Sequence, residues 1–510
     1  MLARNHKRIL RNTAMLYIRM LLAMAVSLYT SRIVLDVLGI EDFGIYHLVV
    51  GFVALLGFLQ GAMTTATQRY FAYDLGQSGG NDLVQIFNTS VMIHCLLALS
   101  IALLAETVGY WFVTTQLTIP EERFSAALAA YHLAVISFAI TVVTVPFTAM
   151  LMAQERMGIF ASIGMIDVML KLAVVLILQF IGSDKLIAYA WLLLAVNFMV
   201  FTLYTLAHKF IFPSIKLRWQ WHSQQFRTML SYTAWNTWGN LAAALSGQGA
   251  NVLLNMFFGP TVNAGRSIAS QANGALKSFV LNIQSAINPQ IIKLYASGDK
   301  SQMQSLIFYA SKYNFFLLFT LALPVLLNTE ALLAIWLVEV PPYAAIFLQL
   351  TILASLIDSF SGPLMTAAQA TGKIKLYQTV IGGILLLNLP ACYLLLIIWR
   401  KPEVILTVTI IISAIAFIAR LIILKKLIEL RIQDYIINVV IRSACVSLVA
   451  TVTAYALNIH QSSDLINIIL NMFFAVIISI VVIIVVGLTA SERNKLGQLL
   501  VSVKQRFIRS

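Results

Sequence analysis

The stretch Gly259–Asn288, GPTVNAGRSIASQANGALKSFVLNIQSAIN, decides how this chain can fold. Its polar side chains recur at steps of 4, 3, 4, 7 and 4 residues, which keeps them on one face of a helix. These side chains are Arg266, Ser270, Asn273, Lys277, Gln284 and Asn288. Most of the intervening positions are apolar, so we expect a membrane helix with one polar stripe.

Two cations on this stripe, Arg266 and Lys277, need a polar environment. They point nearly the same way and lie roughly 16 Å apart along the helix axis. An unpaired charge within a membrane span costs several kcal/mol unless it faces water or a counter-ion. The stripe therefore predicts a water-filled cavity that receives an anionic substrate. The alternative is neutralisation by carboxylates on neighbouring helices, or side chains that extend to the membrane surface.

The composition defines the class of protein. Sixty per cent of the 510 residues are hydrophobic and only 11% are charged, a balance typical of polytopic membrane proteins. The formal charge of +14 comes mainly from short segments between apolar runs, so nucleic acid is not expected as a partner. Cys95, Cys392 and Cys445 lie inside apolar runs without ligand-like spacing, so no disulfide, metal or cofactor is expected.

The apolar runs predict an all-α membrane protein with about fourteen transmembrane helices. They lie at 13–35, 43–67, 84–113, 124–152, 159–181, 186–208, 228–257, 262–290, 304–327, 343–368, 376–398, 403–424, 436–457 and 465–488. If both termini are cytoplasmic, 22 Lys and Arg residues fall in cytoplasmic segments. Four fall on the opposite side, namely Arg123, Lys185, Arg400 and Lys401. This asymmetry predicts that both termini are cytoplasmic.

An internal repeat divides the chain. A shift of 220 residues pairs several residues of 10–23 with residues of 230–243, and pairs Gly39 with Gly259. The shift spans an even number of helices, so the two units have the same orientation in the membrane. We expect an N-terminal lobe at 1–208, a cytoplasmic linker at 209–227, a C-terminal lobe at 228–427, and two extra helices with a basic tail at 428–510.

The segment Ser31–Tyr46, SRIVLDVLGIEDFGIY, resembles the start of bacterial O-antigen and oligosaccharide flippases of the multidrug/oligosaccharidyl-lipid/polysaccharide exporter superfamily. Thr65–Phe71 and Ala149–Arg156 are similar to that family too. The resemblance implies a two-lobed, alternating-access transporter in the bacterial inner membrane. Its cargo would be a polyprenyl-diphosphate-linked oligosaccharide, such as an O-antigen unit, moved from the cytoplasmic to the outer leaflet. Membrane lipids and other polysaccharide-assembly membrane proteins would be its partners.

The candidate substrate contacts are spread over several helices. They are Arg19, Arg266, Lys277, Asn273, Gln284, Asn240, Asn251 and Arg69. Arginine suits a diphosphate because its planar fork can bind two oxygens at once, and amides suit sugar hydroxyls. For the asparagines near 236–255, interhelical hydrogen bonds are the alternative. For Arg69, capture of the lipid headgroup competes with a simple anchor at the helix end.

Two carboxylates are candidates for coupling transport to H⁺ or Na⁺. Asp167 lies four residues before Lys171, the spacing of an intrahelical ion pair, so mutual neutralisation is its alternative role. Asp358 has no such neighbour. It precedes Gly362 and Pro363, which interrupt the helical hydrogen bonds and can supply a bend.

Lys312, Arg420 and Arg442 lie near the cytoplasmic ends of their spans, so their side chains are expected to reach the membrane surface. No phosphate-binding glycine loop or pair of catalytic carboxylates occurs, so an enzyme or an ATP-driven transporter is not expected. A polymerase or ligase acting on the same glycans is the alternative of another class. Within the superfamily, the alternative is a drug or cation exporter, which would need acids where this chain has cations.

Overall fold

The structure is a computed structural model, and it describes most of the chain. The described residues are 2–55, 67, 71, 83–154, 156–218, 241–242, 244–371, 373–457 and 465–494, with most side chains given from residue 21 onward. No strand occurs within these ranges, and helices account for nearly all of them. The prediction of an all-α protein is therefore confirmed for the part that the structure describes.

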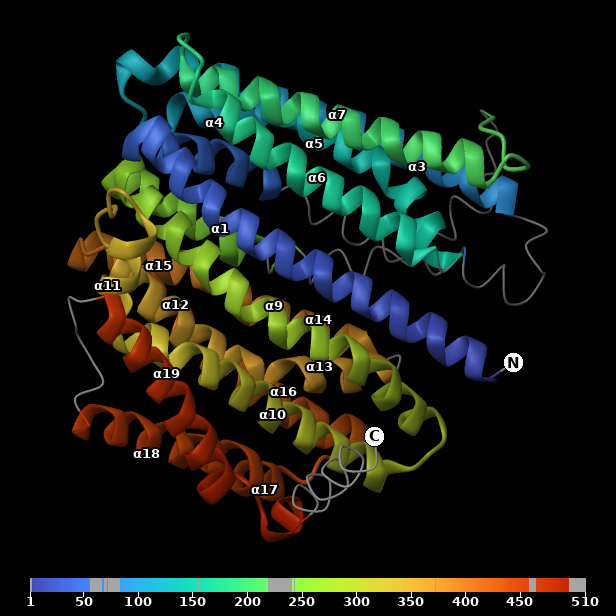
Figure 1. Ribbon diagram of the computed structural model, residues 1–510, viewed down its shortest axis with the longest axis vertical. Coiled ribbons are helices and arrows are strands. Elements are labelled where there is room, and N and C mark those ends of the chain that lie inside the picture. The colour runs from blue at the N-terminus through green and yellow to red at the C-terminus, as the bar shows by residue number, and fades with distance from the viewer. Residues whose placement is uncertain are drawn as a thin grey trace. The chain divides into compact units, whose positions relative to one another are not determined.

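Figure 1 shows the helices. They are α1 Leu2–Leu55, α3 Leu83–Leu104, α4 Tyr110–Thr115, α5 Phe124–Ala153, α6 Met157–Leu178, α7 Lys185–Ile211, α9 Pro260–Ala296, α10 Lys300–Leu327, α11 Thr329–Trp336, α12 Ala344–Ser359, α13 Ser361–Ala370, α14 Ile374–Leu386, α15 Asn388–Trp399, α16 Val404–Ile428, α17 Ile432–Tyr435, α18 Arg442–Ala456 and α19 Leu465–Val482. Short π-helical turns lie at Ala105–Gly109, Ile436–Ile441 and Ile483–Gly487, and a 3₁₀ turn at Glu121–Arg123. Residues 244–258 are also helical.

Eleven helices in the described ranges are long and apolar enough to cross a membrane. One of them, Leu21–Val53, covers parts of the first two predicted runs. Within the seventh run, residues 228–240 and 243 lie outside the described residues, and α9 is not among the eleven because of its polar stripe. Large apolar side chains within the spans are exposed, for example Leu448 at 67% and Phe473 at 61%, as expected for a surface that faces lipid. The chain is a multi-pass membrane protein.

The chain forms two compact units. Unit 1 comprises Met1–Gln271, Leu337–Ala344 and Gln378–Val408, and unit 2 comprises Ala272–Trp336, Ala345–Tyr377 and Thr409–Ser510. Helix α9 starts in unit 1 and ends in unit 2.

Two glycines that the 220-residue shift pairs have the same positive φ. Gly39 and Gly259 both have a φ of 78°, a region that strains residues with a side chain and that glycine enters freely. Gly39 divides α1 into two helices, and Gly259 separates the helical residues 244–258 from α9. Gly44 packs against the backbone of Pro260, so the two corners also meet. The matching corners support the internal repeat.

Unit 1 contains a buried core between its long helices. Helix α5 packs against α3 and α7, and α6 packs against α1 and α7. Ile45, Val49 and Tyr131 are fully buried there. The Tyr131 hydroxyl donates a 2.6 Å hydrogen bond to the carbonyl of Ala105, the first residue of a π-helical turn. A buried tyrosine therefore pins this irregular turn to the core.

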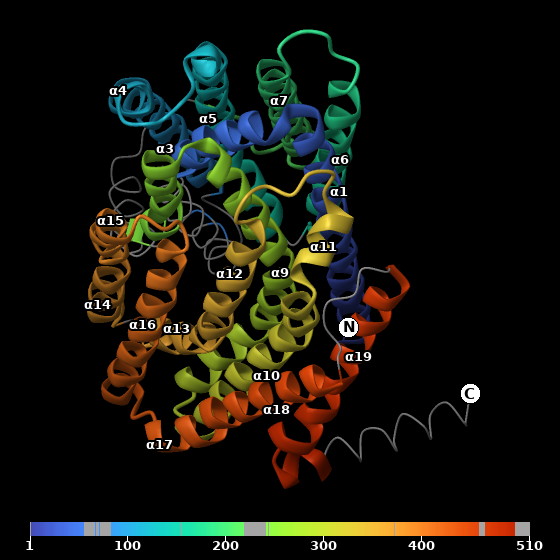
Figure 2. The same cartoon turned by 90° about the vertical axis from the view of Figure 1, so that its left-hand side faces the viewer.

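Unit 2 holds its C-terminal helices through a buried ion pair. Helix α10 packs against α13 and α19, and α18 lies beside α19 (Figure 2). Lys312 of α10 donates to both oxygens of Glu492 at 2.7 and 2.8 Å, with side chains only 3% and 5% exposed. Glu492 also exchanges hydrogen bonds with Thr489 in a capping box. The expectation that Lys312 reaches the membrane surface is wrong, because the C-terminal segment brings a carboxylate to it.

The predicted interruption at Gly362 and Pro363 is present. Helix α12 ends at Ser359 and α13 begins at Ser361. The carbonyl of Phe360, between them, accepts hydrogen bonds from the hydroxyls of Ser311 at 3.2 Å and Tyr435 at 3.5 Å. Side chains of other helices thus satisfy the backbone at the break.

Candidate functional site

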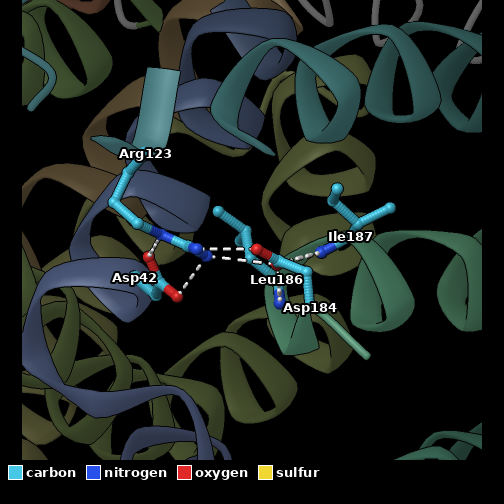
Figure 3. Close-up of polar contacts among 5 residues, drawn as sticks. All are labelled: Asp42, Arg123, Asp184, Leu186 and Ile187. Carbon is cyan, nitrogen blue, oxygen red and sulfur yellow. Dashed lines mark hydrogen bonds and ion pairs between the residues drawn. The ribbon is translucent and has the colours of Figure 1, made fainter. Parts of the chain in front are cut away.

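The cationic side chains differ in whether a carboxylate neutralises them, and Arg123 is fully neutralised (Figure 3). Its Nε and Nη2 donate to the two oxygens of Asp42 in α1 at 2.7 and 2.6 Å. Its Nη1 and Nη2 donate to those of Asp184 at 2.6 and 3.1 Å. Two bidentate carboxylates leave this guanidinium little capacity for a ligand. Arg123 therefore joins three segments of unit 1.

Asp184 has a second structural role at the start of α7. Its carboxylate accepts hydrogen bonds from the backbone N–H groups of Leu186 at 3.0 Å and Ile187 at 3.3 Å, as an N-cap does. The hydrogen bond from Arg123 is the largest cause that lowers the pKa of Asp184, and these N–H groups add to it against the opposing effect of burial. Asp184 is therefore a charged carboxylate at neutral pH.

The predicted ion pair between Asp167 and Lys171 is present in α6. Lys171 Nζ lies 2.9 Å from an oxygen of Asp167. Lys171 also lines a cavity of about 260 Å³, whose wall includes polar side chains of α5 and α7. Among these, Asn197 donates a hydrogen bond to the Ser137 hydroxyl. The structure thus supports mutual neutralisation of the pair, and the coupling role of Asp167 stays a prediction.

Arg266, in unit 1, has no such neutralisation. Its side chain is buried, with the residue 8% exposed. Its Nε donates to Asn251 Oδ1 at 2.8 Å, while Nη1 is buried without a hydrogen-bond partner among the described residues. No carboxylate of the described residues lies within 4 Å of it. A buried guanidinium with unused donors is costly, and an anion would satisfy both its charge and its N–H groups.

Other hydrogen bonds hold the asparagine that contacts Arg266. Asn251 Nδ2 donates to Gln248 Oε1 at 2.7 Å, and the Asn251 carbonyl accepts from Asn263 at 3.1 Å. One turn further along this helix, Asn255 exchanges two hydrogen bonds with the backbone of Thr118, at 2.9 and 3.1 Å. Asn251 thus makes an interhelical hydrogen bond that orients Arg266, whereas Asn255 ties this helix to the non-helical segment around Thr118.

The polar stripe of α9 continues into unit 2, where three of its side chains contact α12 or α13. The contacts are Asn273 Nδ2 to Ser355 Oγ at 2.9 Å, Gln284 against Gly362, and Thr366 Oγ1 to Asn288 Oδ1 at 2.9 Å. Residue numbers increase together on both sides of this interface, so the helices run parallel. Asn273 Oδ1 is buried and has no hydrogen-bond partner in the ranges that the structure describes, so it can still accept a hydrogen bond.

Lys277 of α9 and Asp358 of α12 carry opposite charges in unit 2. Each lies about one helical turn beyond the contact between Asn273 and Ser355. Both are partly exposed. Neither makes a hydrogen bond or an ion pair within the described part of unit 2, so both charges remain available to a ligand or a cation.

Arg420 of α16 is partly exposed and makes two interhelical hydrogen bonds, and the prediction that its side chain reaches the membrane surface stays a prediction. Its Nε donates to the Tyr377 hydroxyl at 3.1 Å, and its Nη1 donates to Ser361 Oγ at 2.9 Å. The sequence indicates a helix interruption at Ser361, because Gly362 and Pro363 follow it directly. Which helix would face that serine could not be deduced from the sequence.

Three candidate residues cannot be placed. Arg69 and Asn240 lie outside the described residues, and Arg19 lies in α1 at a position whose side chain is not described. Their predicted contacts with the substrate remain predictions.

Comparison with known proteins identifies the fold. No protein-family model matches the chain, and no curated protein sequence matches it either. Among solved structures, the lipid II flippase MurJ in an inward closed conformation is similar over 93% of this chain and 98% of that chain. The TM-score is 0.67 and the sequence identity 11%.

Two further structures have the same fold. An inward-facing multidrug resistance MATE family transporter of the MOP superfamily matches over 81% of this chain and 94% of its own, with a TM-score of 0.60 and 13% identity. A MOP superfamily transporter from Pyrococcus furiosus Vc1, reported to have a binding pocket of reverse polarity, matches over 83% and 96%, with a TM-score of 0.57 and 14% identity. The chain has the fold of MOP superfamily transporters.

Proposed function

We propose that this protein moves a polyprenyl-diphosphate-linked oligosaccharide, such as an O-antigen unit, from the cytoplasmic to the outer leaflet by alternating access. The observation that carries the proposal is Arg266, a buried guanidinium with an unused donor and no carboxylate within 4 Å in the described chain. A diphosphate supplies the negative charge and the paired oxygens that this group lacks. The fold adds support, because similar solved structures include a lipid flippase.

The proposal gives each candidate residue a role. The diphosphate contacts are Arg19, Arg266 and Lys277, and Arg69 captures the headgroup at the cytoplasmic surface. The glycan contacts are the amides of Asn240, Asn251, Asn273 and Gln284. The free Oδ1 of Asn273 supports this role, because a sugar hydroxyl can donate to it.

Coupling of transport to H⁺ or Na⁺ is assigned to Asp358, with Asp167 as the second candidate. Asp358 is the better candidate because it has no ion-pair partner in the described part of unit 2, whereas Asp167 already pairs with Lys171. A carboxylate that no cationic side chain neutralises can take up a cation from the aqueous phase.

The proposal includes the placement of the protein in the cell. We infer that it lies in the bacterial inner membrane with both termini cytoplasmic, since the distribution of Lys and Arg favours this orientation. The proposed lobes are 1–208 and 228–427, joined by the linker 209–227 and followed by the extra segment 428–510. Membrane lipids and other polysaccharide-assembly membrane proteins are its proposed partners.

Transport by purified protein in vesicles tests the proposal. Vesicles that contain a fluorescent polyprenyl-diphosphate saccharide are scored for its movement between leaflets, with Arg266→Gln and Lys277→Gln as the test variants. Lys425→Gln is the matched control, because Lys425 is an exposed cation in the last turn of α16. We expect both test variants to lose transport and the control to retain it. Normal transport by both test variants would overturn the role given to the α9 cations.

The second candidate is a cation-coupled drug exporter, which the similarity to the MATE transporter favours. Such a protein needs acidic side chains to attract cationic drugs, whereas Arg266 and Lys277 are positive. In the same vesicles, export of a cationic dye without movement of the saccharide would favour this candidate.

A further inference from the structure

Arg420 is a membrane cation to which the proposed function gives no role. It lies in unit 2, eight residues before the end of α16, or roughly 12 Å into the span. Its Nε and Nη1 donate to the hydroxyls of Tyr377 and Ser361 at 3.1 and 2.9 Å. These two residues are only 2% and 8% exposed. Two buried hydroxyls on two other helices thus hold the guanidinium in one position.

These hydroxyls orient the guanidinium but do not neutralise it. No carboxylate in the described part of unit 2 lies within 4 Å of Arg420. Arg123 provides the contrast, because two carboxylates saturate it. Hydroxyls carry no charge, and a cation that meets only neutral groups of the described chain at this depth is costly unless water or an anion meets it.

The unused donors of Arg420 suit phosphate. A guanidinium has five N–H groups in one plane, and Tyr377 and Ser361 occupy two of them. The other three have no hydrogen-bond partner in the described part of unit 2, and a planar fork of this kind matches the oxygens of a phosphate. Every phosphate group presents such oxygens, whichever molecule carries it.

Polar groups of α9 approach the same place. The amide of Gln284 lies against Gly362, the residue after Ser361. Lys277 lies seven residues before Gln284, which is two turns along the same face of α9, or about 10 Å. An amide therefore lies beside the serine that holds Arg420, and a second cation follows on the same stripe.

We propose that Arg420 is a phosphate-binding residue of unit 2, and that Tyr377 and Ser361 position its guanidinium for this role. The inference rests on the proposed function in one respect, since it takes the phosphate to be that of the diphosphate-linked substrate. Free phosphate and the headgroup of an anionic lipid have the same chemistry, so the test must separate these sources.

The test measures binding of phosphate compounds to the full-length protein in nanodiscs of zwitterionic lipid. The compounds are a short isoprenyl diphosphate, inorganic pyrophosphate and inorganic phosphate. We expect Arg420→Gln to weaken binding of isoprenyl diphosphate and pyrophosphate by about 10- to 100-fold. Arg420→Lys keeps the charge but not the planar fork, so it should lower the preference for pyrophosphate over phosphate.

Two further variants separate positioning from general electrostatics. Tyr377→Phe removes one hydrogen bond to Arg420 without changing any charge, and we expect it to weaken diphosphate binding several-fold and to reduce the same preference. Lys425→Gln removes an exposed cation from the same helix and should leave binding unchanged. Thermal unfolding of every variant identifies a failure to fold, and Arg420→Lys and Tyr377→Phe keep the test decisive if Arg420→Gln does not fold.

Three results would overturn the inference. The first is wild-type affinity in Arg420→Gln, and the second is an equal loss in Lys425→Gln. The third is a dependence on Arg420 that appears only in nanodiscs of anionic lipid, which would assign the residue to a lipid headgroup. Failure of the proposed function is distinguishable. A protein that binds diphosphate through Arg420 but moves no saccharide would overturn that function and leave this inference standing.

Discussion

Replacement of Arg123 and of Arg266 by glutamine should have opposite consequences. Both are arginines of unit 1, but carboxylates neutralise only Arg123. The Arg123→Gln variant breaks four charge-assisted hydrogen bonds and leaves Asp42 and Asp184 without their counter-ion. The Arg266→Gln variant removes a buried charge that makes one hydrogen bond and has no carboxylate partner in the described chain.

The structure sets the expected magnitudes. Breaking a buried ion pair costs about 3–5 kcal/mol. The side chains of Arg123, Asp42 and Asp184 are 28%, 15% and 30% exposed, which weakens their interaction, so we expect Arg123→Gln to lose about 2–3 kcal/mol of unfolding free energy. Glutamine at 266 can still donate to Asn251 and no longer carries a buried charge, so we expect stability within about 1 kcal/mol of wild type.

Thermal unfolding of the purified full-length protein, with and without a short isoprenyl diphosphate, measures both effects. A ligand that binds the folded state raises the transition temperature. We expect the transition of Arg123→Gln to fall but still to rise with ligand. We expect the transition of Arg266→Gln to stay near wild type and to respond little to ligand.

Two outcomes would refute this reasoning. If Arg266→Gln unfolds as easily as Arg123→Gln, then Arg266 has a structural role that its contacts do not reveal. If the ligand stabilises Arg266→Gln as much as the wild type, then the buried guanidinium does not bind the diphosphate.

The remaining predictions concern stability and use the same unfolding measurement. Lys312→Met should cost about 3–5 kcal/mol, because it leaves the Glu492 carboxylate buried without its cation, and a second change of Glu492 to Leu should recover most of this loss. Burial by itself raises the pKa of Glu492, but the hydrogen bonds from Lys312 and Thr489 outweigh it and lower the pKa. The stabilisation is therefore complete above about pH 4.3 and is lost as the pH falls through the lowered pKa, whereas a Glu492→Gln variant should lack this loss. Gly39→Ala and Gly259→Ala should each cost about 1–3 kcal/mol because of their positive φ, while Gly182→Ala, with no such φ and open space around it, should change little.

Patterns among residues close in sequence, together with the internal repeat, were sufficient to predict the all-α fold, one ion pair and one pair of matching glycines. A membrane span must satisfy its backbone hydrogen bonds internally, so long apolar runs without strand signals predict helices. The pair of Asp167 and Lys171 followed from their four-residue spacing. The 220-residue shift pairs Gly39 with Gly259, and both have a φ of 78°. Each of these features depends on residues close in sequence or on the chain's own periodicity.

The tertiary structure decided which charges find partners. Arg123 is 81 residues from Asp42 and 61 from Asp184, and Lys312 is 180 residues from Glu492. No periodicity reveals such pairs, because they depend on which helices pack together and in which register. Arg420 differs from Arg123 and Lys312 in its partners, because helix packing places hydroxyls beside it, and no carboxylate of the described part of unit 2. The sequence alone determined that cations lie among apolar helices, and helix packing determined which of them are neutralised and which can still bind an anion.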